Sequence, residues 1–222
     1  MPLRSGALRA VEVLEVAEEA RDITTLKLRD PLCASARPGQ FVMVYVPGLE
    51  EVPMSLSAIG PGPQIAITVK AVGETTKALS ELQPGSKLGL RGPFGRGFKP
   101  IGRKPLVVGG GVGLAPLMPL IEVLASSGLK PTLIMGARTA DELPFLARAR
   151  GVLGPEHVEV ATEDGSLGFR GLATELAGRR LSEGHYDALY ACGPEPMLVK
   201  LLEMALSAGL GHVQMSLERL VK

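Results

Sequence analysis

The chain has 222 residues, of which 45% are hydrophobic and 21% are charged, a composition that supports a folded core and excludes a largely disordered chain. The formal net charge is +1, without a basic block or an acidic tail, so the charge pattern favours neither nucleic acid nor a membrane surface as a partner. With only two cysteines, no secretion signal and no apolar run of the roughly 18 residues that span a bilayer, the sequence predicts a protein of the reducing cytoplasm without disulfides.

The first hundred residues predict an all-β domain. Apolar and polar residues alternate in short runs that end at turns rich in glycine, proline or charged residues. We expect one short helix at 74–82 and six strands, at 7–17, 22–29, 40–46, 53–59, 64–70 and 85–91. Six short strands with one small helix are typical of a closed antiparallel barrel rather than an open sheet.

Near residues 100–104 the pattern changes, and strands begin to alternate with helices. A buried strand opens with Lys104 and Pro105, and further strands are expected at 132–137, 158–162, 188–192 and 212–217. The helices between them are expected at 114–126, 140–150, 171–180 and 194–208. Such a βα repeat predicts a parallel sheet covered by helices on both faces. We place the boundary at 97–103, which gives domains of residues 1–100 and 101–222.

The segment GGGVGLAP at 109–116 lies directly between a predicted strand and a predicted helix. Glycines at such a turn let the backbone approach a diphosphate, and the helix N-terminus adds N–H groups and a favourable dipole. The spacing differs from the usual dinucleotide fingerprint because Pro116 stands in place of the third glycine. The residues alone leave two interpretations open, a nucleotide-binding turn and a plain strand-to-helix connection.

A second segment, CGPEPM at 192–197, follows a later strand of the same domain. Gly193 and Pro194 end the strand, and Pro194 suits the first turn of a helix because its missing N–H is not needed there. Cys192 is then expected at the carboxyl end of a parallel strand, the edge where open α/β sheets bind ligands. The alternative is an ordinary buried cysteine without a role in binding.

Two segments of the barrel domain are also candidates for binding. The alternation of PMSLS at 53–57 places Ser55 and Ser57 on the same side of a strand. Their hydroxyls either reach a flavin or its ribityl chain, or are ordinary polar positions on a solvated face. The segment GPFGRGF at 92–98 is a glycine- and proline-rich turn with two aromatic residues, which taken by itself also fits an interdomain linker.

Two further turns have both a functional and a purely structural interpretation. Gly73, Thr75 and Thr76 open the short helix and form either an anion site or a capping box without a ligand. Asp164 in TEDGS, at 162–166, follows a strand and either accepts hydrogen bonds from a ribose or shapes an Asp-Gly turn.

The sequence predicts neither a catalytic set of side chains nor a metal site. No Ser–His–Asp or Cys–His arrangement is evident. The three histidines, His157, His185 and His212, have no metal-ligand spacing, so solvated or capping roles are expected for them.

The order of the candidate segments is more specific than any one of them. PMSLS, VGETT, GPFGRGF, GGGVGLAP, TEDGS and CGPEPM together resemble the ferredoxin-reductase superfamily along nearly the whole chain. Within it, GPFGRGF and the terminal SLER at 216–219 most resemble the electron-transfer subunits of two-component, NAD-dependent dihydroorotate dehydrogenases. The resemblance implies an N-terminal antiparallel FAD-binding β-barrel at 1–100, followed by a parallel-sheet, Rossmann-like NAD-binding α/β domain at 101–222.

The resemblance also assigns residues to the two cofactors. The isoalloxazine ring and ribityl chain of FAD would lie along Pro53, Met54, Ser55 and Ser57, and its diphosphate would be held by Gly73, Thr75 and Thr76. The diphosphate of NADH would be held by Gly110, Gly111, Val112 and Gly113, the adenosine half would lie near Asp164, and the nicotinamide would lie close to Cys192, Gly193 and Pro194. The chemistry then belongs to the cofactors, and no catalytic side chain is expected.

The implied function is electron transfer between NAD(H) and a partner oxidoreductase in a hetero-oligomer, the partner being the dihydroorotate dehydrogenase catalytic subunit of pyrimidine biosynthesis. Two alternatives stay open. One is a reductase of the same type for another partner, such as a hydrogenase, a sulfur reductase or a ferredoxin. The other is a nucleotide-binding subunit without redox activity. NADH rather than NADPH is expected by resemblance, and Arg138 is either a contact for a 2′-phosphate or a solvated residue at a helix start.

Two features depart from the family pattern. Val52, beside Glu50 and Glu51, stands where many members carry an arginine that pairs with the FAD phosphates, and Arg91 is the candidate to compensate. In the dihydroorotate dehydrogenase subunits a cysteine-rich segment that binds a [2Fe–2S] cluster follows the SLER stretch. This chain stops at Lys222, and its two cysteines cannot supply four ligands. We therefore expect either a truncated sequence or electron transfer without a cluster of its own.

Overall fold

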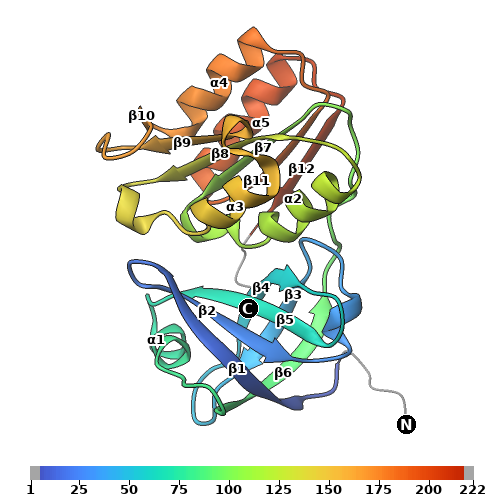
Figure 1. Cartoon of the computed structure of the whole chain (residues 1–222), viewed down its shortest axis with the longest axis vertical. Coiled ribbons are helices and arrows are strands. Elements are labelled where there is room, and N and C mark those ends of the chain that lie inside the picture. The colour runs from blue at the N-terminus through green and yellow to red at the C-terminus, as the bar shows by residue number, and fades with distance from the viewer. Residues whose placement is uncertain (1–5, 218–222) are drawn as a thin grey trace. The chain divides into compact units, whose positions relative to one another are not determined.

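The computed structural model describes residues 6–217, and its contacts divide the chain into two units that meet in the sequence between Phe98 and Lys99 (Figure 1). The first unit consists of strands and one short α-helix, and the second alternates strands with helices. Of the SLER segment, residues 216 and 217 are described, whereas Glu218 and Arg219 lie outside the described residues.

Six strands of the first unit form a closed barrel in the order β1-β2-β5-β4-β3-β6. All neighbouring pairs are antiparallel. The elements are β1 (Arg9–Ala20), β2 (Ile23–Arg29), a 3₁₀ turn η1 (Cys33–Ser35), β3 (Phe41–Tyr45), β4 (Val52–Ile59), β5 (Gln64–Lys70), α1 (Glu74–Ser80) and β6 (Lys87–Phe94). The predicted barrel of six strands and one small helix is confirmed.

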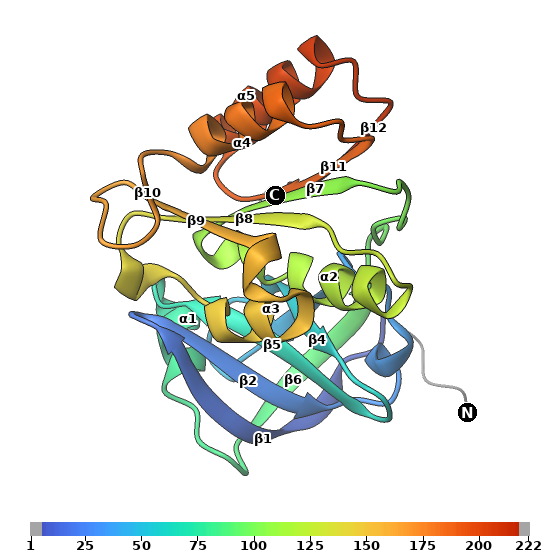
Figure 2. The same cartoon turned by 45° about the horizontal axis from the view of Figure 1, so that its top comes forward.

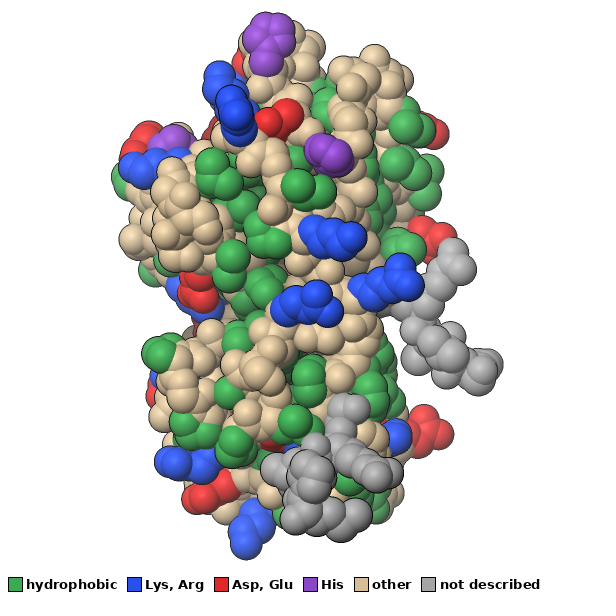
Figure 3. Space-filling view, turned by 90° about the vertical axis from the view of Figure 1, so that its right-hand side faces the viewer, with side chains coloured by type: hydrophobic (Ala, Val, Ile, Leu, Met, Phe, Trp, Pro, Cys, Tyr) green, Lys and Arg blue, Asp and Glu red, His purple; other side chains and the backbone are tan. Residues whose placement is uncertain are grey.

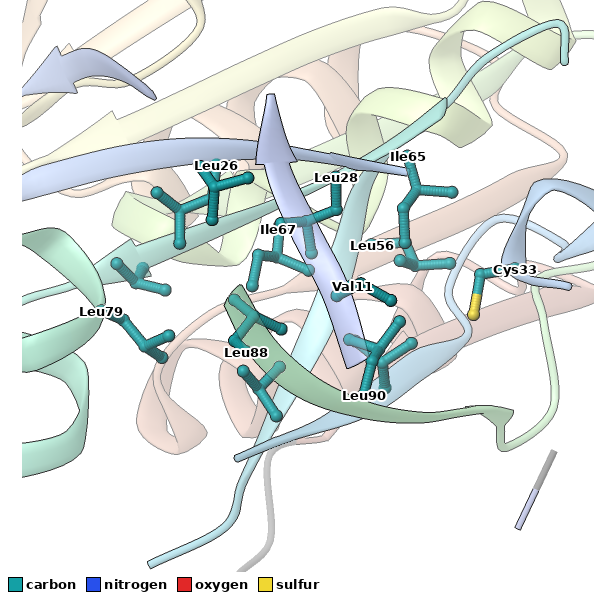
Figure 4. Packing of buried hydrophobic residues seen from close by; sticks show 14 residues of the cluster. Val11, Leu26, Leu28, Cys33, Leu56, Ile65, Ile67, Leu79, Leu88 and Leu90 are labelled. Carbon is teal, nitrogen blue, oxygen red and sulfur yellow. The ribbon is translucent and has the colours of Figure 1, made fainter. Parts of the chain in front are cut away.

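Alternate side chains of these strands form the apolar core of the barrel, shown in Figure 4. Leu26 and Leu28 of β2 meet Ile65 and Ile67 of the adjacent strand β5, and each of the four is at most 2% exposed. Full burial of one such side chain stabilises the folded state by about 1.5–3 kcal/mol. The inward set accounts for the alternation in the sequence and leaves the opposite face of each strand for other contacts.

A six-stranded parallel sheet in the order β10-β9-β8-β7-β11-β12 forms the centre of the second unit. Helices α2 and α3 lie on one face of this sheet, and α4 and α5 lie on the other (Figure 2). The strands are β7 (Pro105–Gly110), β8 (Thr132–Ala137), β9 (Val158–Thr162), β10 (Phe169–Arg170), β11 (Ala188–Cys192) and β12 (His212–Ser216). The helices are α2 (Leu117–Ser126), α3 (Leu146–Leu153), α4 (Ala173–Glu183) and α5 (Glu195–Ser207), joined by the 3₁₀ turns η2 (Gly111–Leu114), η3 (Ala140–Glu142) and η4 (Pro155–His157). The predicted parallel sheet with helices on both faces is confirmed.

The single helix predicted at 140–150 is wrong in its first half. The chain forms the short turn η3, then an extended segment, and α3 begins only at Leu146. Pro144 explains the break, because a proline disfavours helical backbone in the preceding residue, and Leu143 is extended with φ −94° and ψ 104°. Phe145 adopts φ 66° immediately before the helix. The two-residue strand β10 is too short to be visible in the sequence pattern.

The segment that leads into the second unit is fastened to strands β11 and β12. The hydroxyl of the buried Tyr190 accepts a hydrogen bond from the N–H of Ile101 at 2.7 Å and lies within 2.9 Å of the carbonyl oxygens of Lys99 and Ile101. Gln214 accepts from the N–H of Lys99 and donates to its carbonyl, each at 2.8 Å. Two side chains therefore satisfy the backbone of this entering segment.

Asp187 holds the next part of the same segment. Its carboxylate accepts hydrogen bonds from the N–H groups of Arg103 at 2.6 Å and Lys104 at 2.9 Å. Burial by itself would raise the pKa of Asp187, but these N–H groups outweigh it, and the pKa lies below its ordinary value of 3.8. The carboxylate form thus stabilises the entry to β7.

Within residues 6–217, no helix is long and apolar enough to cross a membrane. On the face drawn in Figure 3, hydrophobic side chains are distributed among charged and neutral ones.

Candidate functional site

The carboxyl edge of the parallel sheet brings together the two glycine-containing segments of the second unit. Strand β7 ends at Gly110 and β11 ends at Cys192, and these strands are direct neighbours in which Cys192 pairs with Gly109. The turns that follow, at 110–113 and 192–194, therefore leave the same edge of the sheet. This is the edge at which open α/β sheets bind their ligands.

Close backbone packing joins these two turns. A Cβ atom added to Gly113 would lie 2.6 Å from the carbonyl oxygen of Cys192 and 2.8 Å from the Cα of Gly193. No real Cβ contact is that short, so a side chain at position 113 would force the two turns apart. A Cβ added to Gly193 would lie 3.1 Å from the backbone nitrogen of Gly110. Glycine is required here because main chain packs on main chain.

The glycines of the first turn have distinct roles. Gly109 lies beneath Leu114, since a Cβ at Gly109 would approach the side chain of Leu114 to 2.4 Å. Gly111 has φ +54°, and a Cβ there would meet nothing within 4 Å. The turn thus has a packed side toward the core and an open side above Gly111, with helix α2 beginning shortly afterwards at Leu117.

Cys192 is only 1% exposed, as expected for the last residue of a central strand. The close contact that it makes at the turn is through its carbonyl group, against Gly113. Pro194 is the N-cap residue of α5, with φ −55°. The segment 192–194 therefore offers mainly backbone to a ligand.

Asp164 shapes the turn that follows β9. Its carboxylate accepts hydrogen bonds from the hydroxyl of Ser166 at 2.6 Å and from the N–H of Ser166 at 3.0 Å. These bonds, that of the hydroxyl first, lower the pKa of Asp164 below its ordinary value. Gly165 follows with φ +78°, so the turn interpretation of the Asp-Gly pair is correct, while the carboxylate stays exposed.

The loops after β8 and β9 are joined to each other. The N–H of Asp164 donates to the carbonyl of Arg138 at 3.2 Å. The guanidinium of Arg138 donates to the buried carboxylate of Glu142 at 2.9 and 3.2 Å. Arg138 is therefore balanced by a neighbouring carboxylate, although its side chain is 66% exposed.

In the first unit, strand β4 separates its side chains onto two faces. Val52, Met54 and Leu56 pack against the barrel core, so the intervening Pro53 and Ser55 point to the opposite face. The side chain of Met54 is thus directed away from the face that carries Pro53 and Ser55. Pro53 is exposed and Ser55 is half-buried.

Ser57 lies at a bulge in β4 and is fully buried. Its hydroxyl accepts a hydrogen bond from Thr68 at 2.8 Å, and the hydroxyls of Thr68 and Thr25 are 2.7 Å apart. The three hydroxyls form a chain across β4, β5 and β2. The sequence prediction of a solvated or ligand-facing Ser57 missed these partners.

The start of α1 uses its threonine hydroxyls within the protein. Thr76 Oγ1 accepts from the N–H groups of Gly73 at 2.9 Å and Val72 at 3.1 Å, as in a helix cap. Thr75 Oγ1 donates to the carbonyl of Glu50 at 3.1 Å. An anion at this turn would therefore be met mainly by the N–H groups of the first helical turn, which have no partner inside the helix.

Arg91 on β6 forms a two-pronged ion pair with Glu51, the residue before β4. Its Nε lies 2.8 Å from Oε1 of Glu51, and its Nη2 contacts Oε2. The hydrogen bonds from Arg91 lower the pKa of Glu51. The guanidinium of Arg91 is therefore held by the residue that lies between Glu50 and Val52 in the sequence. The carbonyl of Glu50 in turn accepts a hydrogen bond from Thr75.

The segment GPFGRGF is a packed part of the first unit and not a free linker. Phe94 at the end of β6 and Phe41 of β3 have ring centroids 5.8 Å apart. Phe98 is 7% exposed and lies against Gly39, while a Cβ at Gly97 would lie 2.8 Å from the carbonyl of Pro38. The glycines let this segment lie close to the loop before β3.

Comparison with known proteins gives consistent results. No family model matches the chain. It is 39% identical over 210 residues to the probable dihydroorotate dehydrogenase B (NAD(+)), electron transfer subunit, of Methanocaldococcus jannaschii, covering 95% of this chain and 77% of that protein. The chain belongs to this family of electron transfer subunits. The corresponding protein of Methanothermobacter thermautotrophicus is 40% identical over 215 residues, covering 96% of this chain and 78% of the relative.

The family assignment agrees with solved structures. An NADH-dependent reduced ferredoxin-NADP oxidoreductase, studied for flavin-based electron bifurcation, superposes with a TM-score of 0.83 at 29% identity. The match covers 95% of this chain and 77% of that one. The resemblance to the ferredoxin-reductase superfamily is therefore confirmed, together with the fold of a barrel followed by a parallel-sheet domain.

The sequence analysis missed some residues of the candidate site. Met197 belongs to the CGPEPM segment but was given no role, although its side chain lies against Gly110 and Gly193. Glu142 and Glu51 were not recognised as partners of Arg138 and Arg91. Arg138 precedes the 3₁₀ turn η3 and Thr139 is extended, so the helical four-residue rule does not predict the Arg138–Glu142 pair, which depends on the tertiary fold like the other contacts.

The cysteines do not form a metal centre. Among residues 6–217 there is no group of three or more His, Cys, Asp or Glu side chains that could hold a metal ion. Cys33 is buried in the barrel and Cys192 in the sheet. Burial, aided by the charge of Asp30, raises the pKa of Cys33 to about 12, so its thiol is protonated and unreactive at neutral pH.

Proposed function

We propose that this chain transfers electrons between NAD(H) and the catalytic subunit of a dihydroorotate dehydrogenase, using FAD bound to its barrel. The observation that carries the proposal is the close backbone packing of the turns at 110–113 and 192–194 along one sheet edge. It occurs in a chain that belongs to a family of electron transfer subunits.

The second unit would bind NAD(H) along the carboxyl edge of its sheet. Main chain without Cβ atoms can approach a diphosphate closely, and the start of α2 adds a favourable dipole. We assign the diphosphate to Gly110, Gly111, Val112 and Gly113, the adenosine half to Asp164, and the nicotinamide to Cys192, Gly193 and Pro194. The open space above Gly111 supports this assignment, because a ligand can approach the backbone there.

The loop after β9 favours NADH over NADPH. The exposed carboxylate of Asp164, beside Glu163, repels a 2′-phosphate and can accept hydrogen bonds from a ribose hydroxyl. We therefore propose NADH as the physiological donor.

The first unit would bind FAD on the outer side of β4 and at the start of α1. Pro53 and Ser55 share one face, where they would line the ring and the ribityl chain, and Ser57 follows at the bulge. Because the side chain of Met54 packs toward the core, we expect it to contribute through its main chain. Gly73, Thr75 and Thr76 would line the diphosphate. The N–H groups of Thr75 and Thr76 would face it, because the N–H of Gly73 already donates to Thr76 Oγ1.

When bound, FAD supplies a ring that accepts a hydride from NADH and passes electrons to a partner. In this proposal the residues of this chain bind the two cofactors and orient them. No side chain is required as an acid or base in this scheme, which agrees with the lack of a catalytic set in the sequence.

The chain's own residues do not fit a [2Fe–2S] cluster. Such a cluster needs four protein ligands, whereas the sequence has two cysteines, one buried in each unit. We propose that electrons leave without a cluster bound by these 222 residues. Iron analysis of the purified chain should find no stoichiometric iron, and two irons per chain would contradict this.

Reconstitution tests the FAD part of the proposal. The purified chain is incubated with FAD and desalted, and its visible spectrum is recorded together with its flavin content. A retained flavin band at about one FAD per chain is expected. A chain that is folded by circular dichroism but retains no flavin, even in excess FAD, would remove the proposed function.

A different redox partner is the second candidate, because a structural relative at 29% identity is a ferredoxin-NADP oxidoreductase. The two candidates are separated by measuring NADH oxidation with the purified dihydroorotate dehydrogenase catalytic subunit and with a ferredoxin. Stable co-elution with the catalytic subunit and orotate-dependent NADH oxidation support the first candidate. Turnover with ferredoxin alone supports the second.

A further inference from the structure

Met197 lies in the first turn of α5, three residues after Pro194, and belongs to the CGPEPM segment. Its side chain is half-buried and packs against the apolar cluster beneath the sheet edge. From there it reaches both glycine turns. A Cβ on Gly110 would lie 3.0 Å from its Sδ, and one on Gly193 would lie 2.5 Å from its Cε. The thioether therefore rests on the backbone of both turns.

The two turns differ in how they are fixed to the core. The turn at 110–113 is anchored by Leu114 and Leu117, which are fully buried and pack on Gly109. The turn at 192–194 contains Gly193 and Pro194, which offer little side chain with which to fill the space beside them. Met197 fills that space, and an unbranched, polarizable side chain suits such an irregular gap.

We infer that Met197 is a positioning residue, whose thioether holds the turn at 192–194 in register with the turn at 110–113. This inference rests on the proposed function, since that function places the nicotinamide at one turn and the diphosphate at the other. A ligand that spans both turns depends on their register. A ligand that ends at the diphosphate depends only on the turn anchored by Leu114.

The test compares two ligands across three variants by isothermal titration calorimetry. NADH spans both turns, whereas ADP-ribose has the same diphosphate and adenosine but no nicotinamide. Met197→Ala is expected to weaken NADH binding by about tenfold and to change ADP-ribose binding by less than about twofold. Met197→Leu keeps most of the side-chain volume and should restore NADH binding to within about threefold of the parent chain.

Met204→Ala is the matched control, because it makes the same truncation on the same helix. Its side chain contacts Gly178 of α4. A purely structural effect of losing a methionine from α5 would lower the melting temperature in both alanine variants and leave the ratio of NADH to ADP-ribose affinity unchanged in both.

The inference is overturned if Met197→Ala leaves that ratio unchanged, or if Met204→Ala changes it equally. Should Met197→Ala fail to fold, the smaller truncation Met197→Val decides by the same ratio. If the parent chain binds neither ligand, the proposed NADH site fails. If the parent chain binds both ligands and Met197→Ala has the same affinity ratio, only the role of Met197 fails.

Discussion

Gly113 is the residue at which the two turns of the second unit touch. A Cβ there would lie 2.6 Å from the carbonyl oxygen of Cys192, a backbone atom that cannot move without shifting β11. Gly113→Ala should therefore lower the free energy of unfolding by about 1–3 kcal/mol, as overpacking usually does. It should also weaken NADH binding by at least about tenfold, because the turns separate. Urea unfolding and calorimetry measure the two effects.

Gly151→Ala provides the control for this substitution. Gly151 lies in α3, and a Cβ there would meet nothing within 4 Å. Alanine in a helix is favoured over glycine by up to about 1 kcal/mol, so this variant should be slightly more stable and bind NADH normally. A Gly113→Ala chain that matched the parent in both measurements would mean that the turns are not in contact.

Arg91 is predicted to supply the positive charge that Val52 lacks. Its guanidinium is held by Glu51, the residue before β4, and the carbonyl of the neighbouring Glu50 accepts a hydrogen bond from Thr75 of the turn that we propose for the FAD diphosphate. Arg91→Gln should weaken FAD binding by about tenfold, the effect of one lost charge-assisted hydrogen bond. Riboflavin, which has no phosphate, should bind equally to parent and variant in a fluorescence-quenching titration.

The exposed ion pair of Lys27 and Glu15, in the same barrel, provides the control for the Arg91 substitution. Lys27→Gln removes a surface cation from the same unit and should leave FAD affinity unchanged, because exposed pairs contribute little. If Arg91→Gln weakened riboflavin binding as much as FAD binding, the guanidinium would act on the barrel rather than on the phosphates.

At the residue scale, the sequence could locate polar side chains on a strand, but it could not identify the residues to which they bond. Alternation in PMSLS predicted that Ser55 and Ser57 share one side of the strand, but the bulge at Ser57 breaks this alternation, and Ser57 is fully buried whereas Ser55 is half-buried. The pattern could not reveal that Ser57 bonds Thr68, because that contact joins two strands through a register that is set by a bulge. The same limit applies to Met197, whose contacts depend on how α5 packs against the edge of the sheet.

At the scale of elements, the entering segment of the second unit depends on one buried hydroxyl. Tyr190→Phe removes the acceptor for the N–H of Ile101 and leaves that group without its partner. The loss should lower the free energy of unfolding by about 1–3 kcal/mol. Tyr186→Phe, which loses a longer bond of 3.2 Å to Thr132, should cost less, and equal losses in urea unfolding would argue against this anchoring role.

Asp187 makes the same anchor dependent on pH. Its folded pKa lies below the ordinary value of 3.8, so the unfolded state binds the proton more readily, and stability rises with pH in this range. The contribution is complete above 3.8 and disappears as the pH falls through the lowered value. The difference in unfolding free energy between the parent and Asp187→Asn should thus shrink in acid. A difference that grew as the pH fell would contradict this.

The type and order of the helices and strands could be predicted from the sequence because each type of element has its own pattern of apolar residues. The fully buried strand β11 appears as a continuous apolar run, and the barrel strands appear as alternating ones. The helix predicted at 140–150 failed because periodicity outweighed Pro144, which is the stronger local signal. Strand β10 has two residues and depends on pairing with β9, which no local pattern encodes.

At the scale of the whole molecule, the order of six segments predicted the family although each segment was weak alone. In the second unit, the parallel topology brings two of these segments, 109–116 and 192–197, to one sheet edge although they lie far apart in the sequence. The function depends on both units. The second unit would deliver NADH and the first would hold FAD, so either unit without its ligand would leave the chain inactive.

The most direct measurement is rapid mixing of the FAD-reconstituted chain with NADH in the absence of oxygen, followed by the absorbance of the bound flavin. We expect NADH to bleach the flavin in a single turnover, and NADPH to do so much more slowly. A chain that retains FAD and binds NADH, yet whose flavin absorbance does not change, would contradict electron transfer as its function.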